Sequence, residues 1–348
     1  MKSDIARQFE NYLLGAKRIL ITSHLNPDAD ALGSSLLLAQ ALRLRLAGKQ
    51  ISHVLEDQAP RFDFLAGYDA VVFEPPDKAV ARLKPDLLII VDADSFERVS
   101  RSGAAALRSW LAKNNVASVV IDHHQPSETE NHALVINRLL DGGAASPAAT
   151  QDVYRLCFEL LGYPKPKGYS ELTLAGIVGD TGRFAYQNAY HRETFAIVSD
   201  LLDGGASIEK IENRLHRYDR QSLAVLAELL ANVKLTESYT YSYVSDSFAN
   251  SYDGPAEALK ASAELFANQY IRNVEDRQWG FIVYPDSKLG KNYFSVSLRS
   301  LAGGKDVAEI AKKLGGGGHR PAAGGKLQAR SAKAAIQLVQ AAIDETDV

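Results

Sequence analysis

The chain has 348 residues, 46% of them hydrophobic and 23% charged, with a formal net charge of −3; this composition excludes a mainly disordered protein, and the length suits about two globular domains. Its single cysteine, Cys157, excludes an internal disulfide framework and a zinc site built on clustered cysteines. The charged N-terminus does not resemble a signal peptide and no apolar run reaches the ~20 residues of a membrane span, so we expect a cytoplasmic protein.

The first part of the chain alternates short apolar segments with helical ones. Strands are predicted over 18–23, 50–55, 86–92 and 117–122, and helices over 30–47 and 104–113. The strand segments are continuously apolar, which is typical of a parallel sheet covered on both faces. From Pro147 the pattern becomes helical, with Ser146 as the expected N-cap and Pro147 in the first turn. Further helices are predicted over 170–181, 192–202, 208–215 and 220–235.

The pattern changes after about residue 234. The segment 236–248 alternates tyrosine and valine with small polar residues, as a half-exposed strand does. A helix over 255–267, strands over 280–284 and 293–298, and a helix over 307–314 predict a second, smaller α/β domain. We therefore expect an α/β fold with a parallel-sheet domain over 1–205, a helical linker over 206–234 and the smaller domain over 235–348.

Charged side chains follow three of the predicted strands. His24, Asp28 and Asp30 lie where the first strand gives way to a helix, a position at which open α/β sheets hold ligands. One imidazole and two carboxylates make a metal-ligand set. Two aspartates at this place are equally typical of helix N-caps, and the segment alone leaves both interpretations open.

The other two strand ends carry Asp92 with Asp94, and Asp122 with His123 and His124. An aspartate at a strand end can simply anchor a loop, and a histidine pair can be structural. Adjacent histidines point in different directions, so we expect one to be a ligand and the other to face a substrate. Three strand ends that deliver histidine and aspartate to one edge of the sheet favour a metal site over these structural interpretations.

Two glycine-containing segments come later in the chain. Asp180 lies in a glycine-broken turn within 176–184, where compactness or site geometry would favour glycine. The glycine run at 315–325 either forms a flexible loop or exposes backbone N–H groups as an anion-binding nest, with His319 directly after the first glycines. No acidic residue occurs from 310 to 343, which indicates either an anion site or a solvated helix face formed by the basic residues Lys312, Lys313, Arg320, Lys326, Arg330 and Lys333.

Together these segments resemble one family. His24-x-x-x-Asp28-x-Asp30, Asp92, Asp122-His123-His124 and Asp180 resemble the four motifs of the DHH phosphoesterases, and the glycine run resembles the signature of their C-terminal DHH-associated domain. Within this superfamily the chain is most similar to the two-domain nanoRNase/pAp phosphatase branch. Its length barely permits the additional parts of RecJ-type exonucleases, and it lacks the basic motif of family II pyrophosphatases. Arg320 stands where many relatives have proline directly after the histidine, which leaves the substrate choice open.

The resemblance implies two metal ions, most commonly Mn²⁺, with Mg²⁺ or Co²⁺ as substitutes. One ion would be held by His24, Asp28 and Asp92, and the other by Asp30, Asp92, His123 and Asp180, so that Asp92 would bridge them. Asp92, His123 and His124 would be the catalytic residues, and His124 would also contact the phosphate. The expected contacts to the substrate phosphate, in a cleft between the two domains, are Arg299, Gly316, Gly317, Gly318 and His319, with Arg183 as a further candidate.

The resemblance further implies hydrolysis of short nucleotides: di- to pentanucleotide RNA, pApA or 3′-phosphoadenosine 5′-phosphate (pAp). The alternatives are a cyclic-dinucleotide phosphodiesterase, a RecJ-like single-strand exonuclease and a non-enzymatic nucleotide-binding sensor. Neither a membrane nor a protein partner is implied, and a homodimer is left open.

Overall fold

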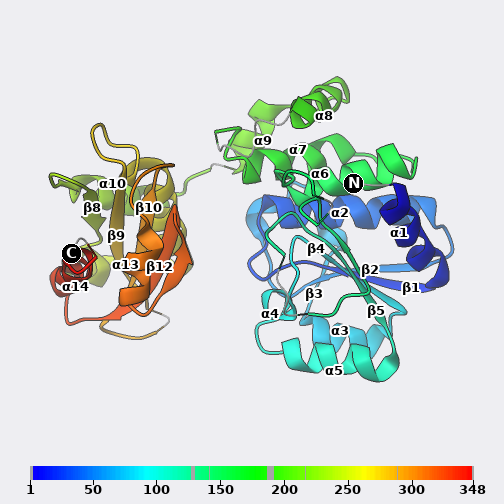
Figure 1. Cartoon of the computed structure of the whole chain (residues 1–348), viewed down its shortest axis with the longest axis horizontal. Helices are drawn as coiled ribbons and strands as arrows, with labels where there is room; N and C mark the ends of the chain where they lie inside the picture. The colour runs from blue at the N-terminus through cyan, green and yellow to red at the C-terminus, as the bar shows by residue number, and fades with distance from the viewer. Residues whose placement is uncertain are drawn as a thin grey trace. The chain divides into compact units, whose positions relative to one another are not determined.

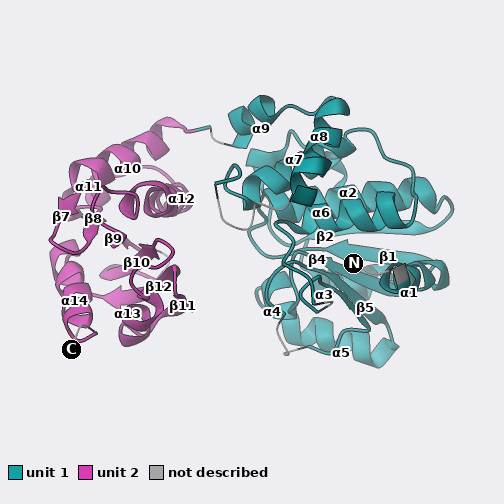
Figure 2. Ribbon diagram, turned by 45° about the horizontal axis from the view of Figure 1, so that its top comes forward, with its two compact units in different colours: residues 1–217 teal, residues 218–348 magenta. Residues whose placement is uncertain are grey.

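The computed structural model describes residues 3–126, 130–140, 142–185, 192–215, 217–287 and 289–346. The chain divides into two compact units, residues 1–217 (unit 1) and 218–348 (unit 2), each with its own six-stranded sheet (Figures 1 and 2). This confirms the predicted α/β class, with a parallel-sheet domain followed by a smaller one. The domain boundaries at residues 205 and 235 and the active-site cleft stay predictions. Within the described ranges, no helix is long and apolar enough to cross a membrane.

The sheet of unit 1 is entirely parallel, with the strand order β3-β2-β1-β4-β5-β6. Its strands are β1 (Arg18–Thr22), β2 (Gln50–Leu55), β3 (Val72–Phe73), β4 (Leu87–Val91), β5 (Ala117–Ile121) and β6 (Leu134–Ile136). Strands β1, β4 and β5, which carry the charged residues at their ends, are direct neighbours. Because parallel strands share one direction, the side chains that follow them gather at one edge of the sheet.

Helices cover both faces of this sheet (Figure 1). They are α1 (Ser3–Gly15), α2 (Ala29–Arg45), α3 (Pro76–Leu83), α4 (Phe96–Val99), α5 (Ala104–Asn114), α6 (Ala149–Tyr154), α7 (Tyr169–Asp180), α8 (Arg192–Asp203) and α9 (Ile208–Leu215). In β4, Leu87, Ile89 and Val91 pack in the same core as α1, α2 and α7, whereas Leu88 and Ile90 pack against α3 and α5. Burial on both faces explains why the strand is apolar at every position.

The start of α6 differs from the prediction. The helix begins at Ala149, and the hydroxyl of Ser146 accepts no hydrogen bond from the first turn, so Ser146 does not cap it. The carboxylate of Asp30 instead accepts hydrogen bonds from the backbone amides of Ala149 and Thr150, at 2.6 and 2.9 Å. A carboxylate from α2 therefore satisfies the N-terminus of a helix that lies far away in the sequence.

Unit 2 contains a mixed sheet with the strand order β11-β12-β10-β9-β8-β7, in which only β8 and β9 pair in parallel. Its strands are β7 (Lys234–Leu235), β8 (Thr240–Tyr243), β9 (Trp279–Pro285), β10 (Tyr293–Ser300), β11 (Gly317–His319) and β12 (Ala322–Gln328). Its helices are α10 (Arg220–Ala231), α11 (Asp246–Ser251), α12 (Ala256–Phe266), α13 (Val307–Lys313) and α14 (Ala332–Asp344). Helices α13 and α14 pack on one face of the sheet, and α10 and α12 on the other.

Three segments of unit 2 differ from the sequence analysis. The strand expected over 236–248 ends at Tyr243, because Ser245 caps the short helix α11 by accepting a hydrogen bond from the amide of Phe248. The helix expected over 220–235 ends at Ala231. Part of the glycine run is a strand, because Gly317–His319 pairs with β12 at the edge of the sheet.

Candidate metal and catalytic site

The structure brings together the six residues that the sequence analysis assigned as metal ligands. His24 follows β1, Asp92 directly follows β4, and His123 follows β5. Asp28 and Asp30 stand at the start of α2, and Asp180 is the last residue of α7 rather than part of an open turn. One edge of the parallel sheet and the ends of two helices thus build a single cluster.

The cluster contains two ligand groups joined by Asp92, and a third possible group consists of Asp92, Asp122, His123 and His124. Possible ligand atoms of His24, Asp28 and Asp92 lie within 4.8 Å of one another, and so do those of Asp30, His123 and Asp180. Oδ2 of Asp92 is 3.3 Å from Nε2 of His24, and Oδ1 is 3.3 Å from Nε2 of His123. The two oxygens of one buried carboxylate therefore face one imidazole of each group.

Both histidines are oriented by their second ring nitrogen. Nδ1 of His24 is 2.8 Å from the carbonyl oxygen of Leu25, and Nδ1 of His123 is 3.1 Å from that of Ser146. Since a carbonyl only accepts, each Nδ1 donates and each Nε2 is left to face the aspartates. This is the arrangement by which backbone carbonyls fix metal-ligating histidines.

Two buried polar atoms of the cluster, Oδ1 of Asp92 and Nε2 of His123, make no hydrogen bond to any residue that the structure describes. Buried polar atoms are nearly always satisfied, so an unsatisfied pair in this place indicates a missing partner. A divalent cation fits, because the donors are imidazole and carboxylate, which suit Mn²⁺, Mg²⁺ and Co²⁺ better than thiolate-seeking ions.

The cluster perturbs the acidity of its members. Burial by itself would lower the pKa of His24, but the contact with Asp92 and the charge of Asp28 raise it to about 9. Burial raises the pKa of Asp30 well above its usual value, and the charges of Asp92 and Asp180 add to this effect. Burial also opposes ionisation of Asp92, yet its contacts with His123 and His24 hold its pKa below the usual range. Concentrated opposite charges of this kind are typical of functional sites.

The backbone at Asp92 is in the left-handed region, with φ of +61°. Its amide still donates to the carbonyl of Ile121 at 2.8 Å, so the residue is tied to β5. Left-handed backbone is uncommon for residues other than glycine and is often associated with functional sites. Asp28 has a second role: its Oδ1 accepts the amides of Asp30 and Ala31, so the N-cap interpretation holds alongside its place in the cluster.

The side chain of His124 differs from that of His123 in its hydrogen-bond partner and in its exposure. Its Nδ1 donates to Oδ1 of Asp122 at 2.8 Å, and its side chain is 42% exposed, against 9% for His123. The same carboxylate oxygen accepts the amide of His123 at 2.8 Å. Asn137 donates to the carbonyl of His124, which further fixes the turn. The pair thus divides into one buried member of the cluster and one accessible imidazole.

Two other candidates in unit 1 lie outside the two ligand groups. Arg183 is exposed three positions after Asp180, in a turn where both it and Phe184 have positive φ. Asp94 is only half-buried, and its carbonyl accepts from Nε2 of His132 at 2.9 Å.

The expected phosphate contacts of unit 2 lie on and beside β10 and β11. Arg299 and the glycines Gly316, Gly317 and Gly318 line a groove of about 1250 Å³, and His319 is exposed at the end of β11. The amide of Gly316 donates to the carbonyl of Ala311, so it is already engaged. Lys312 and Lys313 pair with Glu309 and Glu345, which reduces the local positive charge expected from the sequence.

The sequence analysis missed the partners that support the ligands. Ala149 and Thr150 bind Asp30, and Ser146 binds His123, through groups that have no sequence signature because most are backbone atoms. It also missed Asp286 and Ser295 in the groove of unit 2, where they lie beside Lys326, a residue that it named only as part of a possible anion site or solvated helix face. The alternation of serine with apolar residues along 293–299 was the available signal for Ser295.

Two family models match the chain. Residues 18–177 match the DHH family N-terminal domain, and residues 237–345 match the DHHA1 domain. A bifunctional oligoribonuclease and PAP phosphatase NrnA from Mycoplasma pneumoniae is 29% identical over 93% of this chain and 91% of that protein. The protein of the same name from Thermus thermophilus is 28% identical over 94% of this chain and 89% of its own length.

Solved structures share the fold. An exopolyphosphatase-related protein from Bacteroides fragilis superposes with a TM-score of 0.81 at 22% identity, covering 99% of this chain and 96% of that one. The exonuclease RecJ bound to manganese gives a TM-score of 0.52 at 17% identity, over 99% of this chain and 93% of its own.

Proposed function

We propose that this chain, which belongs to the DHH family, is a metal-dependent phosphoesterase that hydrolyses short oligonucleotides or pAp. The observation that carries this function is the pair of ligand groups joined by the buried carboxylate of Asp92. The substrate class is supported by the relatives named oligoribonuclease and PAP phosphatase, which match nearly the whole chain.

His24, Asp28 and Asp92 would hold one divalent cation, and Asp30, Asp92, His123 and Asp180 the other. Cations bound there supply Lewis acidity to the phosphoester and to the attacking water. We propose Mn²⁺ as the resident ion, with Mg²⁺ or Co²⁺ as substitutes, because mixed imidazole and carboxylate ligands suit Mn²⁺.

His124 is the proposed proton donor. The hydrogen bond from its Nδ1 to Asp122 leaves Nε2 on the accessible side of the ring, where a proton can be held toward the leaving oxygen of a phosphoester. General-acid catalysis of this kind contributes roughly 10²–10⁴-fold to a rate. The hydrogen bond to Asp122 fixes the direction of the imidazole ring.

Unit 2 would bind the substrate phosphate through Arg299, His319 and the amides of Gly317 and Gly318, with Gly316 as part of the same segment. Arg183 of unit 1 is a further candidate contact. The cytoplasmic location and the homodimer stay predictions, which cell fractionation and light scattering of the purified chain test.

A substrate panel tests the proposed function. The purified chain is assayed with Mn²⁺, and again with EDTA, on pAp, pApA, cyclic di-AMP, a 5-mer RNA and a 24-mer RNA. We expect metal-dependent release of phosphate or mononucleotide from pAp and the short RNAs. Preference for cyclic di-AMP would instead identify a cyclic-dinucleotide phosphodiesterase, and nucleotide binding without turnover would identify a sensor.

The same panel tests length selection. Affinity for a long strand depends on many phosphate contacts and falls steeply with salt, whereas this chain carries a net charge of −3. We expect kcat/KM for the 5-mer to exceed that for the 24-mer at physiological salt. Equal values for the two would favour a RecJ-like exonuclease.

A further inference from the structure

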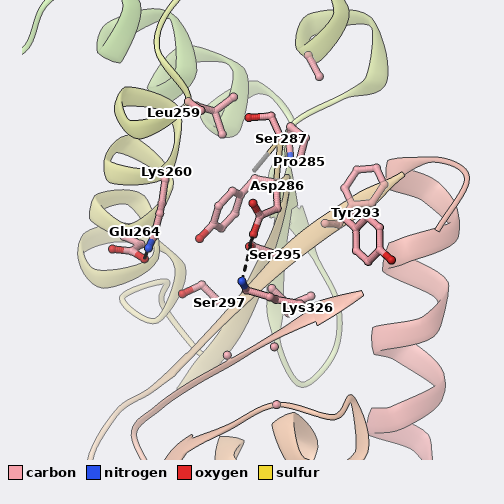
Figure 3. Close-up of a pocket in the computed structure, with 18 of the residues that line it drawn as sticks. Leu259, Lys260, Glu264, Pro285, Asp286, Ser287, Tyr293, Ser295, Ser297 and Lys326 are labelled. Atoms are coloured by element: carbon pink, nitrogen blue, oxygen red, sulfur yellow. Dashed lines mark hydrogen bonds and ion pairs between the residues drawn. The ribbon is translucent and has the colours of Figure 1, made fainter. Parts of the chain in front are cut away.

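The groove of unit 2 extends well beyond the residues expected to bind phosphate. Strands β10 and β12 form its floor, and α12 forms a wall (Figure 3). Side chains alternate along a strand, so Ser295, Ser297 and Arg299 lie on the groove face of β10 while the intervening Val296 and Leu298 pack in the core. The floor is therefore polar, whereas its reverse side is apolar.

The register of the sheet orders the floor from one end to the other. Arg299 pairs with Ala322, Ser297 with Gly324, and Ser295 with Lys326. Four residues of strand separate Arg299 from Ser295, a distance of about 13 Å. A Cβ on Gly324 would lie 2.8 Å from the carbonyl oxygen of Val296, so the middle of the floor stays free of side-chain bulk at this position. The groove thus has polar side chains at both ends, Arg299 at one and Ser295 with Lys326 at the other, and little side-chain bulk between the two ends.

The end away from Arg299 is built around a carboxylate. Oδ2 of Asp286 accepts a hydrogen bond from Oγ of Ser295 at 3.0 Å and lies 3.8 Å from Nζ of Lys326 (Figure 3). The side chain of Asp286 is 16% exposed and that of Lys326 is 62% exposed. A second acid, Glu264, lines the same part of the groove and lies 3.7 Å from Lys260.

Each of these carboxylates lies beside a lysine, so its charge offsets that of the lysine, and a phosphate that approached Asp286 directly would be repelled. A neutral group that donates a hydrogen bond to a carboxylate and accepts one from an ammonium fits instead. Nucleobases with an exocyclic amine beside an unprotonated ring nitrogen have this pattern, and adenine is one of them. The two ends of the floor lie about 13 Å apart along the strand. A nucleotide whose phosphate is bound at Arg299 can therefore reach the other end with its base.

We propose that Asp286 and Lys326 form an adenine subsite, an inference that rests on the proposed function. Asp286 accepts a hydrogen bond from the 6-amino group, and Lys326 donates to the neighbouring ring nitrogen. Ser295 holds the carboxylate in place from the adjacent strand. A site that hydrogen-bonds an amine discriminates against the analogue that lacks it, because the analogue cannot make that hydrogen bond.

The test compares pAp with the 3′,5′-bisphosphate of purine riboside, in which hydrogen replaces the 6-amino group. Binding is measured by titration calorimetry on the full chain in EDTA, and kcat/KM is measured separately with Mn²⁺. We expect wild type to bind pAp at least tenfold more tightly than the desamino analogue. Asp286→Ala should bring that ratio close to one, and Asp344→Ala, on the exposed side of α14, should leave it unchanged.

Lys326→Met should weaken the binding of pAp and of the desamino analogue by a similar factor, because both ligands retain the ring nitrogen. If Asp286→Ala unfolds, Asp286→Glu keeps the charge but moves the carboxylate by one methylene, and it should cut the ratio at least threefold. Equal binding of the two ligands to wild type, or an unchanged ratio in a folded Asp286 variant, overturns the subsite. Absence of any hydrolysis with Mn²⁺ overturns the proposed function instead, and the calorimetric ratio still decides the subsite.

Discussion

Oδ1 of Asp92 lies 3.3 Å from Nε2 of His123, although neither atom takes part in a hydrogen bond within the described part of the chain. The other oxygen of Asp92 lies at the same distance from Nε2 of His24. Because contacts with both imidazoles hold the pKa of Asp92 below its usual range, the carboxylate is charged at neutral pH. One buried charge therefore serves both ligand groups.

Asp92→Asn should abolish turnover without unfolding the chain. The amide has a similar shape but no charge, so it supports neither cation as a bridging ligand. We expect kcat to fall at least 100-fold, which is about 2.7 kcal/mol of activation free energy. Bound Mn²⁺, measured by elemental analysis after dialysis, should fall below two per chain.

Asp69→Asn, at an exposed position in the same unit, is the matched control and should keep the wild-type kcat and metal content. An Asp92→Asn enzyme with two bound ions and more than about a tenth of the wild-type kcat would contradict a bridging role.

His124→Gln should reduce kcat while leaving the metal content intact. His124 shares a possible ligand group with Asp92, Asp122 and His123, but its Nδ1 already donates to Asp122 and its side chain is 42% exposed, so we do not assign it as a ligand. We expect a loss of roughly 10²-fold or more. A leaving group that needs no proton, such as p-nitrophenolate in thymidine 5′-p-nitrophenyl phosphate, should lose far less. Equal losses on both substrates would show that His124 does not donate the proton.

Gly176→Ala should destabilise unit 1 and weaken metal binding together. A Cβ at this position would lie within 2.6 Å of Oδ1 of Asp30 and closer still to the hydroxyl of Thr150. Because α2 and α6 hold these atoms rigidly, overpacking should cost about 1–3 kcal/mol in the free energy of unfolding and should displace a ligand. Urea unfolding in a Trp279→Phe background measures this, since Trp110 then reports on unit 1 alone.

Gly15→Ala is the control for this substitution. Gly15 ends α1, and a Cβ there would meet no atom within 4 Å. We expect unchanged stability or a gain of up to about 1 kcal/mol, because alanine favours the helix. Similar losses in the two variants would mean that the close approach at Gly176 is unimportant.

The arrangement of the strand ends could be predicted because it depends on short-range patterns. Each apolar run of β1, β4 and β5 is followed within a few residues by its charged side chains, and parallel pairing places these ends together. The support of the site could not be predicted in this way. Asp30 binds the amides at the start of α6, which lie 119 and 120 residues further along the chain and carry no side-chain signal.

The glycine run shows a second limit. Consecutive glycines indicate a loop when they are considered alone, yet a Cβ on Gly316 would lie 2.1 Å from the carbonyl oxygen of Gly324. The glycines therefore permit two strands to approach closely, a reason that appears only when the partner strand is known. Helix α14 was missed despite a usable signal, the apolar spacing of Ile336, Val339 and Ile343.

His319→Ala should damage catalysis without removing the metals. The residue is exposed on unit 2, whereas all proposed ligands belong to unit 1. We expect two Mn²⁺ per chain and a raised KM or lowered kcat for pAp, measured by phosphate release. Loss of bound Mn²⁺ on this substitution would mean that a ligand had been mistaken for a substrate contact.

The buried side chain of His53 should make the stability of unit 1 depend on pH. It is buried in β2 beside Ile21, and neither ring nitrogen has a hydrogen-bond partner among the described residues. Burial, together with the charge of Arg43, lowers its pKa to about 3. Below pH 6.5 the unfolded chain takes up a proton that the folded chain does not, so unfolding becomes easier until pH falls to about 3.

From pH 7 to pH 5 this difference should cost about 2 kcal/mol, at about 1.36 kcal/mol for each pH unit below 6.5. His53→Leu removes the titrating group and fills a buried site with an apolar side chain. Between pH 7 and pH 5, the free energy of unfolding of this variant should therefore fall by about 2 kcal/mol less than that of wild type. The measurement is urea unfolding at both pH values in EDTA, followed through Trp110 in the Trp279→Phe background. His319→Leu, which replaces an exposed histidine, is the control and should show the same pH dependence of the free energy of unfolding as wild type. If the free energies of unfolding of wild type and His53→Leu change in parallel with pH, His53 is not the origin of the acid sensitivity.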